Sequence, residues 1–453
     1  MPTARRVCCV LGLGLIAVAT GAAPAAASPT VSLVKNINPG SANSNPGGFA
    51  NLPGTPGAFV FSANDGSHGF EVWRSNGSGT RTRLVKDMRF TSGNPSGFTS
   101  FAGKVFYTAF DGYHGYELRS TDGTRAGTKL VKDIAPGIES SSPSQLMVFD
   151  GKLFFSTDDA LWSTDGTEEG TQIVKSFLPS GGLGFPLKVI GQQLFFSAAD
   201  MSHGGELWKS DGTTAGTQVL DSVPGGGGPG PTFLTVAGGR LFFAGTDATH
   251  GTEVWTSNGT AAGTKLVKDI YLHAPSSYPS GFTSYAAKPG SVFFQARDAT
   301  HDYELWKSDG TATGTKLVKD INPSGGSFPF ESANFGGKVL FPADDGTHGS
   351  ELWTSDGTTA GTNLVKDINP GGAGSTGGGF VPFAGKLFFP ATDAAHGTEL
   401  WETNATGAGT KLVADIRPGA AGSAPSFLGV ANHILYFAAN DGPHGMELWK
   451  LVP

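Results

Sequence analysis

Large apolar side chains recur in short runs along almost the whole chain, and Gly, Asp, Asn or Pro bounds each run. The stretch 351–371, which reads ELWTSDGTTAGTNLVKDINPG, shows the repeating unit best. A Glu-Leu-Trp anchor or a close variant recurs every 43 to 51 residues, at Trp73, Trp162, Trp208, Trp255, Trp306, Trp353, Trp401 and Trp449, with Arg119 in the Trp position of a ninth copy. A period of this length indicates one repeat architecture rather than several independent domains.

Within one copy the pattern predicts four short strands, for example over 380–384, 386–391, 399–403 and 410–416. Such segments, rich in aromatic and β-branched residues, leave little room for helix. In the third strand, Leu352 and Trp353 are both large and apolar although they point to opposite faces, so we expect both faces to be buried. The fourth strand carries Lys366 and Asp367, charges that protect an outer edge from pairing with other chains.

The two ends of the repeat array predict how it closes. A sheet buried on both faces with a polar outermost strand is what a blade of a β-propeller requires. The segment 31–40 is a fourth strand with no blade before it, and 447–453 is a third strand with no fourth after it. We expect the first segment to complete the last blade, which removes exposed edges. The count predicts an all-β propeller of nine four-stranded blades over 28–453, with eight blades plus one degenerate unit as the alternative.

Two copies depart from the pattern. One has a shorter segment between its second and third strands, just before Trp162, which predicts a tighter hairpin, and Arg119 in the Trp position of another predicts a local change in packing. Either departure is also a place where a functional break in the symmetry would lie.

Residues 1–27 have the pattern of a secretory signal peptide. Arginines at 5–6 precede an apolar run, and the alanines at 25–27 offer an A-x-A cleavage site. No later segment approaches 18 apolar residues, so we expect a secreted protein without membrane insertion after cleavage. Cys8 and Cys9 are the only cysteines and lie in this segment, so the mature chain must be stable without disulfides.

The charge of the chain limits the classes of partner. Removal of the two N-terminal arginines takes the formal net charge from −7 to −9. Mild acidity argues against nucleic acid and anionic membranes as partners. The 32 Phe and 8 Trp are enough to form a hydrophobic core. We expect the protein to be a monomer.

Eight of the nine copies place the motif Asp-x-x-His-x-x-Glu between the second and third strands, and eight of the ten histidines lie in it. The triplets are Asp65, His68 and Glu71; Asp111, His114 and Glu117; Asp200, His203 and Glu206; Asp247, His250 and Glu253; Asp298, His301 and Glu304; Asp345, His348 and Glu351; Asp393, His396 and Glu399; and Asp441, His444 and Glu447. Such side chains can bind a divalent metal, act as acid and base, or contact a ligand.

A triplet that recurs in almost every copy is more typical of a structural role, because a catalytic site is normally single. We expect Asp to accept turn N–H groups and His to bridge backbone groups. The triplets mark the candidate ligand-binding face, and we expect no metal, no cofactor and no catalytic residue.

Between the third and fourth strands the copies carry Ser/Thr-Asp/Asn-Gly-Thr-x-x-Gly-Thr, which favours tight hairpins. The spacing does not match a calcium-binding loop. Asn76, Asn258 and Asn404 replace the Asp, and Ala405 replaces the Gly, so looser turns are expected there. The chain contains no G-x-S-x-G elbow, no P-loop and no H-E-x-x-H motif.

The run Glu-Leu-Trp-x-Ser-Asp-Gly-Thr, as in 206–213, 304–311 and 351–358, resembles the ELWxxDGT repeat of large secreted bacterial proteins, some of them described as hyalin-like. The resemblance covers essentially everything after the signal segment. It implies an exported repeat protein and brings no established reaction with it.

The linkers from each fourth strand to the next blade vary most among the copies and are expected on the same face as the triplets. They include 136–142, 224–230, 271–278 and 370–375. A rigid scaffold with variable loops on one face suits binding, so the leading hypothesis is a secreted, non-enzymatic module for a glycan or a protein at the cell surface or in the extracellular matrix. The alternatives are a propeller hydrolase or lyase with an asymmetric cluster in the central channel, and a purely structural matrix protein.

Overall fold

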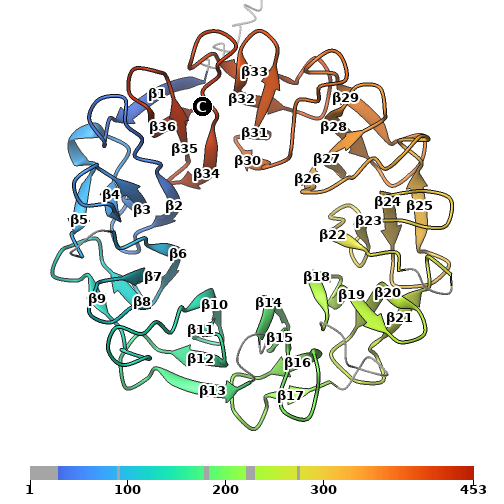
Figure 1. The fold of residues 1–453 in the computed structure, drawn as a ribbon, viewed down its shortest axis with the longest axis horizontal. Coiled ribbons are helices and arrows are strands. Elements are labelled where there is room, and N and C mark those ends of the chain that lie inside the picture. Colours follow the sequence, from blue (N-terminus) through green and yellow to red (C-terminus); the bar gives the residue numbers. More distant parts are fainter. Residues whose placement is uncertain (1–28, 89–91, 178–182, 221–229, 273–275) are drawn as a thin grey trace, which may run out of the picture.

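The computed structural model describes residues 29–88, 92–177, 183–220, 230–272 and 276–453, so the predicted signal segment and most of the linker 224–230 lie outside it. The described residues form nine four-stranded antiparallel sheets arranged in a ring (Figure 1). This confirms the nine-bladed propeller against the eight-bladed alternative. The one helical element in these ranges is the 3-10 turn η1 (Gly79–Arg81). None of the described residues form a helix long and apolar enough to cross a membrane.

The strands follow the chain in order from blade to blade. Blade 1 contains β2 (Gly47–Asn51), β3 (Phe59–Asn64), β4 (Phe70–Ser75) and β5 (Arg83–Lys86); blade 2 contains β6 (Ser96–Phe101), β7 (Lys104–Phe110), β8 (Tyr116–Thr121) and β9 (Lys129–Leu130); blade 3 contains β10 (Ser144–Phe149), β11 (Lys152–Ser156), β12 (Ala160–Thr164) and β13 (Gln172–Ser176). Blade 4 contains β14 (Leu183–Ile190), β15 (Gln193–Ala198), β16 (Glu206–Ser210) and β17 (Gln218–Val219); blade 5 contains β18 (Thr232–Ala237), β19 (Arg240–Asp247), β20 (Gly251–Ser257) and β21 (Lys265–Lys268); blade 6 contains β22 (Ser280–Ser284), β23 (Val292–Ala296), β24 (Glu304–Ser308) and β25 (Lys316–Lys319). Blade 7 contains β26 (Ala333–Phe335), β27 (Lys338–Asp344), β28 (Ser350–Ser355) and β29 (Asn363–Lys366); blade 8 contains β30 (Val381–Phe383), β31 (Lys386–Asp393), β32 (Gly397–Thr403) and β33 (Lys411–Ala414); blade 9 contains β34 (Ser426–Ala431), β35 (Ile434–Asn440), β36 (Met446–Val452) and β1 (Thr30–Lys35).

Each blade runs from the centre of the ring to its rim, with the first strand innermost (Figure 1). Because neighbouring strands are antiparallel, the hairpin between the second and third strands and the linker to the next blade lie on one face of the ring. We call this the hairpin face. The turns after the first and third strands lie on the opposite face, which we call the turn face.

Blade 9 combines the two ends of the array, as the sequence predicts. Strand β1 pairs antiparallel with β36, with Thr30 opposite Val452 and Leu33 opposite Trp449. Figure 1 shows β1 beside β36 at the place where the ring closes. The outer edge of β36 is thereby paired instead of exposed.

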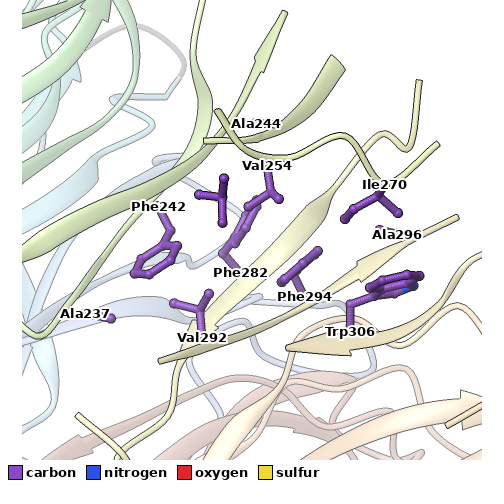
Figure 2. Close-up of a cluster of buried hydrophobic side chains, with 11 residues drawn as sticks. Ala237, Phe242, Ala244, Val254, Ile270, Phe282, Val292, Phe294, Ala296 and Trp306 are labelled. Carbon is purple, nitrogen blue, oxygen red and sulfur yellow. The ribbon is translucent and has the colours of Figure 1, made fainter. Parts of the chain in front are cut away.

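The core lies between successive blades rather than inside one blade. In the cluster between blades 5 and 6, Phe242 and Val254 of blade 5 face Phe294 and Trp306 of blade 6, and each is at most 5% exposed (Figure 2). Burying such side chains contributes about 1.5–3 kcal/mol each relative to leaving them exposed. Clusters of the same composition recur around the ring, so each blade is stabilised mainly by its neighbours.

The lysine of the fourth strand joins adjacent blades. Lys366 donates to the Thr410 carbonyl of the next blade at 2.8 Å and lies 5.5 Å from the centre of the Trp401 ring. The same lysine–carbonyl contact joins Lys35 to Thr82, Lys86 to Thr128, Lys132 to Thr171, Lys268 to Thr315 and Lys319 to Thr362. This residue therefore holds blades together in addition to making the outer strand polar.

The two irregular copies are accommodated locally. In blade 3 the Thr157 N–H donates to the Ala160 carbonyl at 2.9 Å, which closes the predicted tighter hairpin. In blade 2, Arg119 is only 3% exposed; it donates to the Ala109 carbonyl at 3.3 Å and pairs with the Asp111 carboxylate. The Arg119 guanidinium thus occupies the place that a Trp indole has in other blades, and its charge is satisfied by the carbonyl and carboxylate of the same hairpin.

Candidate ligand-binding site

The Asp and His of each triplet form a pair within one hairpin of the hairpin face. Asp345 shows the arrangement: one carboxylate oxygen accepts the Thr347 and His348 N–H groups at 2.9 Å, and the other lies 2.8 Å from His348 Nδ1. The Nδ1–carboxylate distance is 2.7–3.0 Å in all eight triplets. Thus Asp accepts turn N–H groups, and the His ring meets the Asp carboxylate where we expected backbone groups.

The pairing changes the titration of both partners. The hydrogen bond that the Asp345 carboxylate accepts from His348 Nδ1 raises the pKa of His348. Burial alone would raise the pKa of Asp345, but the hydrogen bonds from His348 and Thr347 outweigh it and lower that pKa. The Asp partner likewise raises the pKa of His68, His250 and His396, so these pairs are local charge-assisted contacts that favour protonated imidazole.

The Glu of the triplet is buried and points away from the hairpin surface. Glu351 is fully buried and accepts the Ile368 and Asn369 N–H groups at 3.0 and 3.1 Å and the Ser375 hydroxyl at 2.5 Å. A serine hydroxyl reaches the Glu in six blades, at Ser44, Ser141, Ser277, Ser327, Ser375 and Ser423. The Glu thus fixes the linker that leads to the next blade.

Glu71 differs from these six carboxylates. The serine position of its linker is Gly93, whose N–H donates to Glu71 at 3.1 Å. Burial raises the pKa of Glu71 to about 7, only partly offset by backbone N–H groups. With no hydroxyl donor to offset its burial, this carboxylate is therefore poised to bind a proton near neutral pH.

The triplets are not brought together into one site. Each belongs to its own blade, and its Asp, His and Glu are engaged within that blade or its linker. Among the described residues, no three His, Cys, Asp or Glu side chains are arranged to hold a metal ion. Ligand binding by the triplets stays a prediction.

An asymmetric pocket of about 460 Å³ lies on the hairpin face between blades 5 and 6. Its lining comes from the inner ends of both blades and the linkers before them: Gly230, Thr232, Phe233, Ala244, Thr246, Thr252, Tyr278, Pro279, Ser280, Gln295 and Tyr303. Phe233 and Tyr278 are about half exposed, at 51% and 48%. The lining combines aromatic rings with hydroxyl and amide groups and contains no charged side chain.

One arginine supports the aromatic wall of this pocket. The Arg297 guanidinium lies 5.0 Å from the Tyr278 ring centre, 5.9 Å from that of Tyr303 and 5.8 Å from that of Tyr271. Its Nε donates to the Ser276 carbonyl at 3.1 Å, which fixes its position. Cation–π contacts of this kind hold the tyrosine rings in place before any ligand arrives.

The polar part of the lining is ordered in the same way. Gln295 donates through its amide nitrogen to the Ser280 hydroxyl at 2.7 Å, and the hydroxyls of Thr246 and Thr252 lie 2.8 Å apart. The pocket therefore presents fixed hydrogen-bonding groups beside fixed rings.

The sequence did not single out this pocket. Its aromatic residues come from three separate segments, and only Tyr278 belongs to a linker noted for its variability. The signal lay in the repeat alignment, since several copies place Gly, Asn, Ser or Ala at the positions of Phe233 and Tyr278, whereas blades 9 and 7 place Phe427 and Phe328 there. The expectation that variable linkers and triplet hairpins share one face is confirmed by the strand order.

Comparisons with known proteins bear on the fold alone. No protein-family model matches the chain, and no curated protein matches its sequence. Among solved structures, the chain is similar to dipeptidyl peptidase 4 of Porphyromonas gingivalis, with a TM-score of 0.53 and 9% identity over 88% of this chain and 65% of that chain. It is also similar to the computationally designed Ika8 protein (TM-score 0.44, 14% identity, 92% and 99% covered) and to a puromycin hydrolase (TM-score 0.40, 13% identity, 77% and 58% covered). The chain thus spans less than two thirds of the length of either hydrolase.

Proposed function

We propose that this protein is a secreted, non-enzymatic β-propeller that binds a glycan in the pocket between blades 5 and 6. The pocket lined by Phe233, Tyr278 and Tyr303 carries the proposal. Its volume of about 460 Å³ lies within the range of small-molecule sites, roughly 300–1,000 Å³. Aromatic rings next to hydroxyl and amide groups suit a sugar, which has apolar C–H faces and a polar rim.

Backbone conformation supports a binding role for the two exposed rings. Phe233 and Tyr278 have φ angles of 57° and 46°, in the left-handed region that disfavours bulky side chains. The equivalent positions in other blades hold Gly48, Gly97, Gly281, Gly379, Gln145, Glu331 and Phe427 for the first, and Asn45, Asn94, Ser142, Ala424 and Phe328 for the second. Such strain costs about 1–2 kcal/mol per residue and is typical of functional sites. Both rings are about half exposed, so they offer a surface that a ligand can contact.

The composition of the lining favours binding over catalysis. Hydrolysis of a glycoside or peptide uses a positioned acid, base or activated nucleophile. The lining offers Thr, Ser and Gln but no Asp, Glu, His, Lys or Cys. The uncharged pocket also suits a neutral glycan better than a charged peptide segment.

Binding of neutral oligosaccharides to the mature chain, measured by isothermal titration calorimetry, tests the proposal. Phe233→Gly and Tyr278→Ser replace each ring with a residue that the same position holds in other blades, so both variants should fold. We expect each to weaken binding by about tenfold or more, since truncating a central aromatic contact commonly costs about 2 kcal/mol.

Phe427→Gly provides the matched control, because Phe427 occupies the Phe233 position in blade 9, also with a left-handed φ of 52°. It should leave the affinity unchanged. Equal weakening by Phe427→Gly, or turnover of the bound sugar, would reject the proposal. Binding of proteins but not of any oligosaccharide would assign the face to a protein partner.

A further inference from the structure

The turn face of blade 1 carries a pocket rich in arginine. It encloses about 250 Å³ and is lined by Thr55, Pro56, Ala58, Arg74, Asn76, Thr80, Arg81 and Arg83. Three of these residues are arginines, and none is acidic. We propose that this pocket binds an anionic group, a sulfate or carboxylate, of an acidic polysaccharide.

The first observation is a paired change in the turn between the third and fourth strands. In blades 2 to 8 this turn carries a glycine, such as Gly127, at the position of Arg81. A Cβ at Gly127 would lie 2.1 Å from the Asp122 carboxylate. The turn therefore excludes any residue larger than Gly at this position as long as the Asp122 side chain stays where it is. In blade 1, Asn76 replaces the Asp and Arg81 replaces the glycine. One carboxylate is lost and one guanidinium gained in the same turn.

The altered turn keeps its fold by other means. Asn76 Oδ1 accepts the Ser78 N–H at 3.2 Å and the Ser78 hydroxyl at 2.8 Å, as Asp does with Thr in the other turns. Residues Gly79–Arg81 then form the 3-10 turn η1. Arg81 is exposed, so folding of the turn does not explain its side chain.

The second observation is a like-charge pair across two strands. Arg74 and Arg83 are directly opposite each other in the β4–β5 register. Like charges at such positions destabilise a sheet. The same pair in blade 8 is Glu402 and Lys411, which attract each other. An anion between Arg74 and Arg83 would convert the repulsion in blade 1 into attraction.

The third observation is that these guanidinium groups are available. Within the described part of the chain, no carboxylate lies within 4.0 Å of the guanidinium group of Arg74, Arg81 or Arg83. The described arginine that does form an ion pair is Arg119, in blade 2. Arg74 is half-buried and oriented by one bond to the Gly123 carbonyl at 3.3 Å. By contrast, the corresponding pocket of blade 6 is lined by Asp309 and Asp356 as well as by lysines.

The chemistry of the lining indicates the class of ligand. Guanidinium groups match the planar or tetrahedral oxygens of carboxylate and sulfate with two parallel hydrogen bonds. The Thr55 and Thr80 hydroxyls and the Asn76 amide add neutral groups for a sugar. No aromatic ring lines the pocket, so it lacks the stacking that single-stranded nucleic acid uses. The volume is below about 300 Å³, so the pocket takes one charged unit of a chain.

The test compares binding of dextran sulfate, polygalacturonate, uncharged dextran, inorganic sulfate and a single-stranded oligonucleotide by the mature chain. We expect both acidic polysaccharides to bind, dextran not to bind, and affinity to fall as salt is raised. The double variant Asn76→Asp, Arg81→Gly restores the turn of the other blades and should weaken binding by at least about tenfold, because a hydrogen bond to a charged group is worth about 1.5–3 kcal/mol. Arg83→Gln tests the same pocket without altering the turn.

Arg417→Gln is the matched control, since Arg417 lies in a linker on the hairpin face, outside this pocket. It should bind as the parent does. Equal loss in Arg417→Gln, unchanged binding by the double variant, binding of inorganic sulfate without either polysaccharide, or preference for the oligonucleotide would each overturn the proposal. Phe233→Gly should leave this binding intact, which separates it from the glycan pocket.

Discussion

The Glu447 carboxylate accepts the Ile37 N–H at 2.7 Å, although the two residues are 410 positions apart in the chain. The Ser44 hydroxyl donates to the same carboxylate at 2.7 Å. In five other blades, a buried Glu likewise accepts a hydrogen bond from a serine in the linker to the next blade. The closing blade repeats this contact. The closure is equivalent to an ordinary blade junction, held by strand pairing and by a buried carboxylate.

Deletion of residues 28–37 should lower the melting temperature, because β36 would lose its antiparallel partner and Glu447 would lose a donor. A synthetic peptide covering 29–38 should bind the truncated protein and raise the melting temperature again. Differential scanning calorimetry with and without the peptide measures both effects. An unchanged melting temperature after deletion would contradict a closed ring.

Glu71 should make stability depend on pH in a defined window. Its pKa is raised from 4.5 to about 7 by burial, so between these values the folded state binds more protons than the unfolded chain, and stability falls as pH rises. Gly93→Ser supplies the hydroxyl found in six other blades and should reduce this loss, which we place on the order of 1–3 kcal/mol. Urea unfolding at pH 5 and pH 8 measures it, and an identical pH slope in the variant would disprove the assignment.

Trp353→Ala should destabilise the protein by about 3–5 kcal/mol, the usual cost of removing a large buried ring. Trp353 is 5% exposed and packs against Phe341 and Val339. Val148→Ala is the control, because Val148 is 47% exposed and should change stability by less than about 0.5 kcal/mol. Denaturant unfolding of both variants gives the comparison, and a change below about 1 kcal/mol for Trp353→Ala would contradict its buried position.

The histidine pairs should behave as eight independent structural contacts. A chelator should leave the melting curve unchanged, because each His Nδ1 already meets its own Asp carboxylate; a bound metal would instead stabilise the fold by mass action. His→Ala changes at His250, His348 and His396 should add, since the sites lie in different blades. Strong coupling in a double-mutant cycle, or loss of ligand binding at one position only, would indicate a shared site.

The pairing is also expected to depend on pH. The pKa of His348 is raised by Asp345, so the stability that this pair contributes is present below the unfolded pKa of about 6.5 and lost as pH rises through the folded value. His348→Gln should remove this pH dependence. Although His348 is a base and Glu71 an acid, both contributions to stability fall as pH rises, because both pKa values are raised in the folded protein.

The fold could be predicted from the sequence because strand position and closure depend on side chains that recur in every copy. The role of Glu351 could not, since its serine partner lies 24 residues downstream in a linker. The spacing of 24 residues between Glu and Ser recurs in other copies, so a search for residues that recur together would have found this pair. The two asymmetric pockets depend instead on local combinations of residues: Phe233 beside Tyr278 at one blade junction, and Arg81 with Asn76 in one turn. The sequence shows that these residues differ from the repeat, but the residues that line a pocket with them are known only from the structure.

The register of the closing strands sets how the ring responds to mechanical force. Thr30 lies opposite Val452, so the start of β1 and the end of β36 are neighbours, and the two antiparallel strands extend side by side from this point. Tension applied between these ends would load the hydrogen bonds one after another, from Thr30 inward, rather than all together in shear. The ring should therefore unzip at low force when it is held at both ends, and withstand much higher force when it is pulled across its blades.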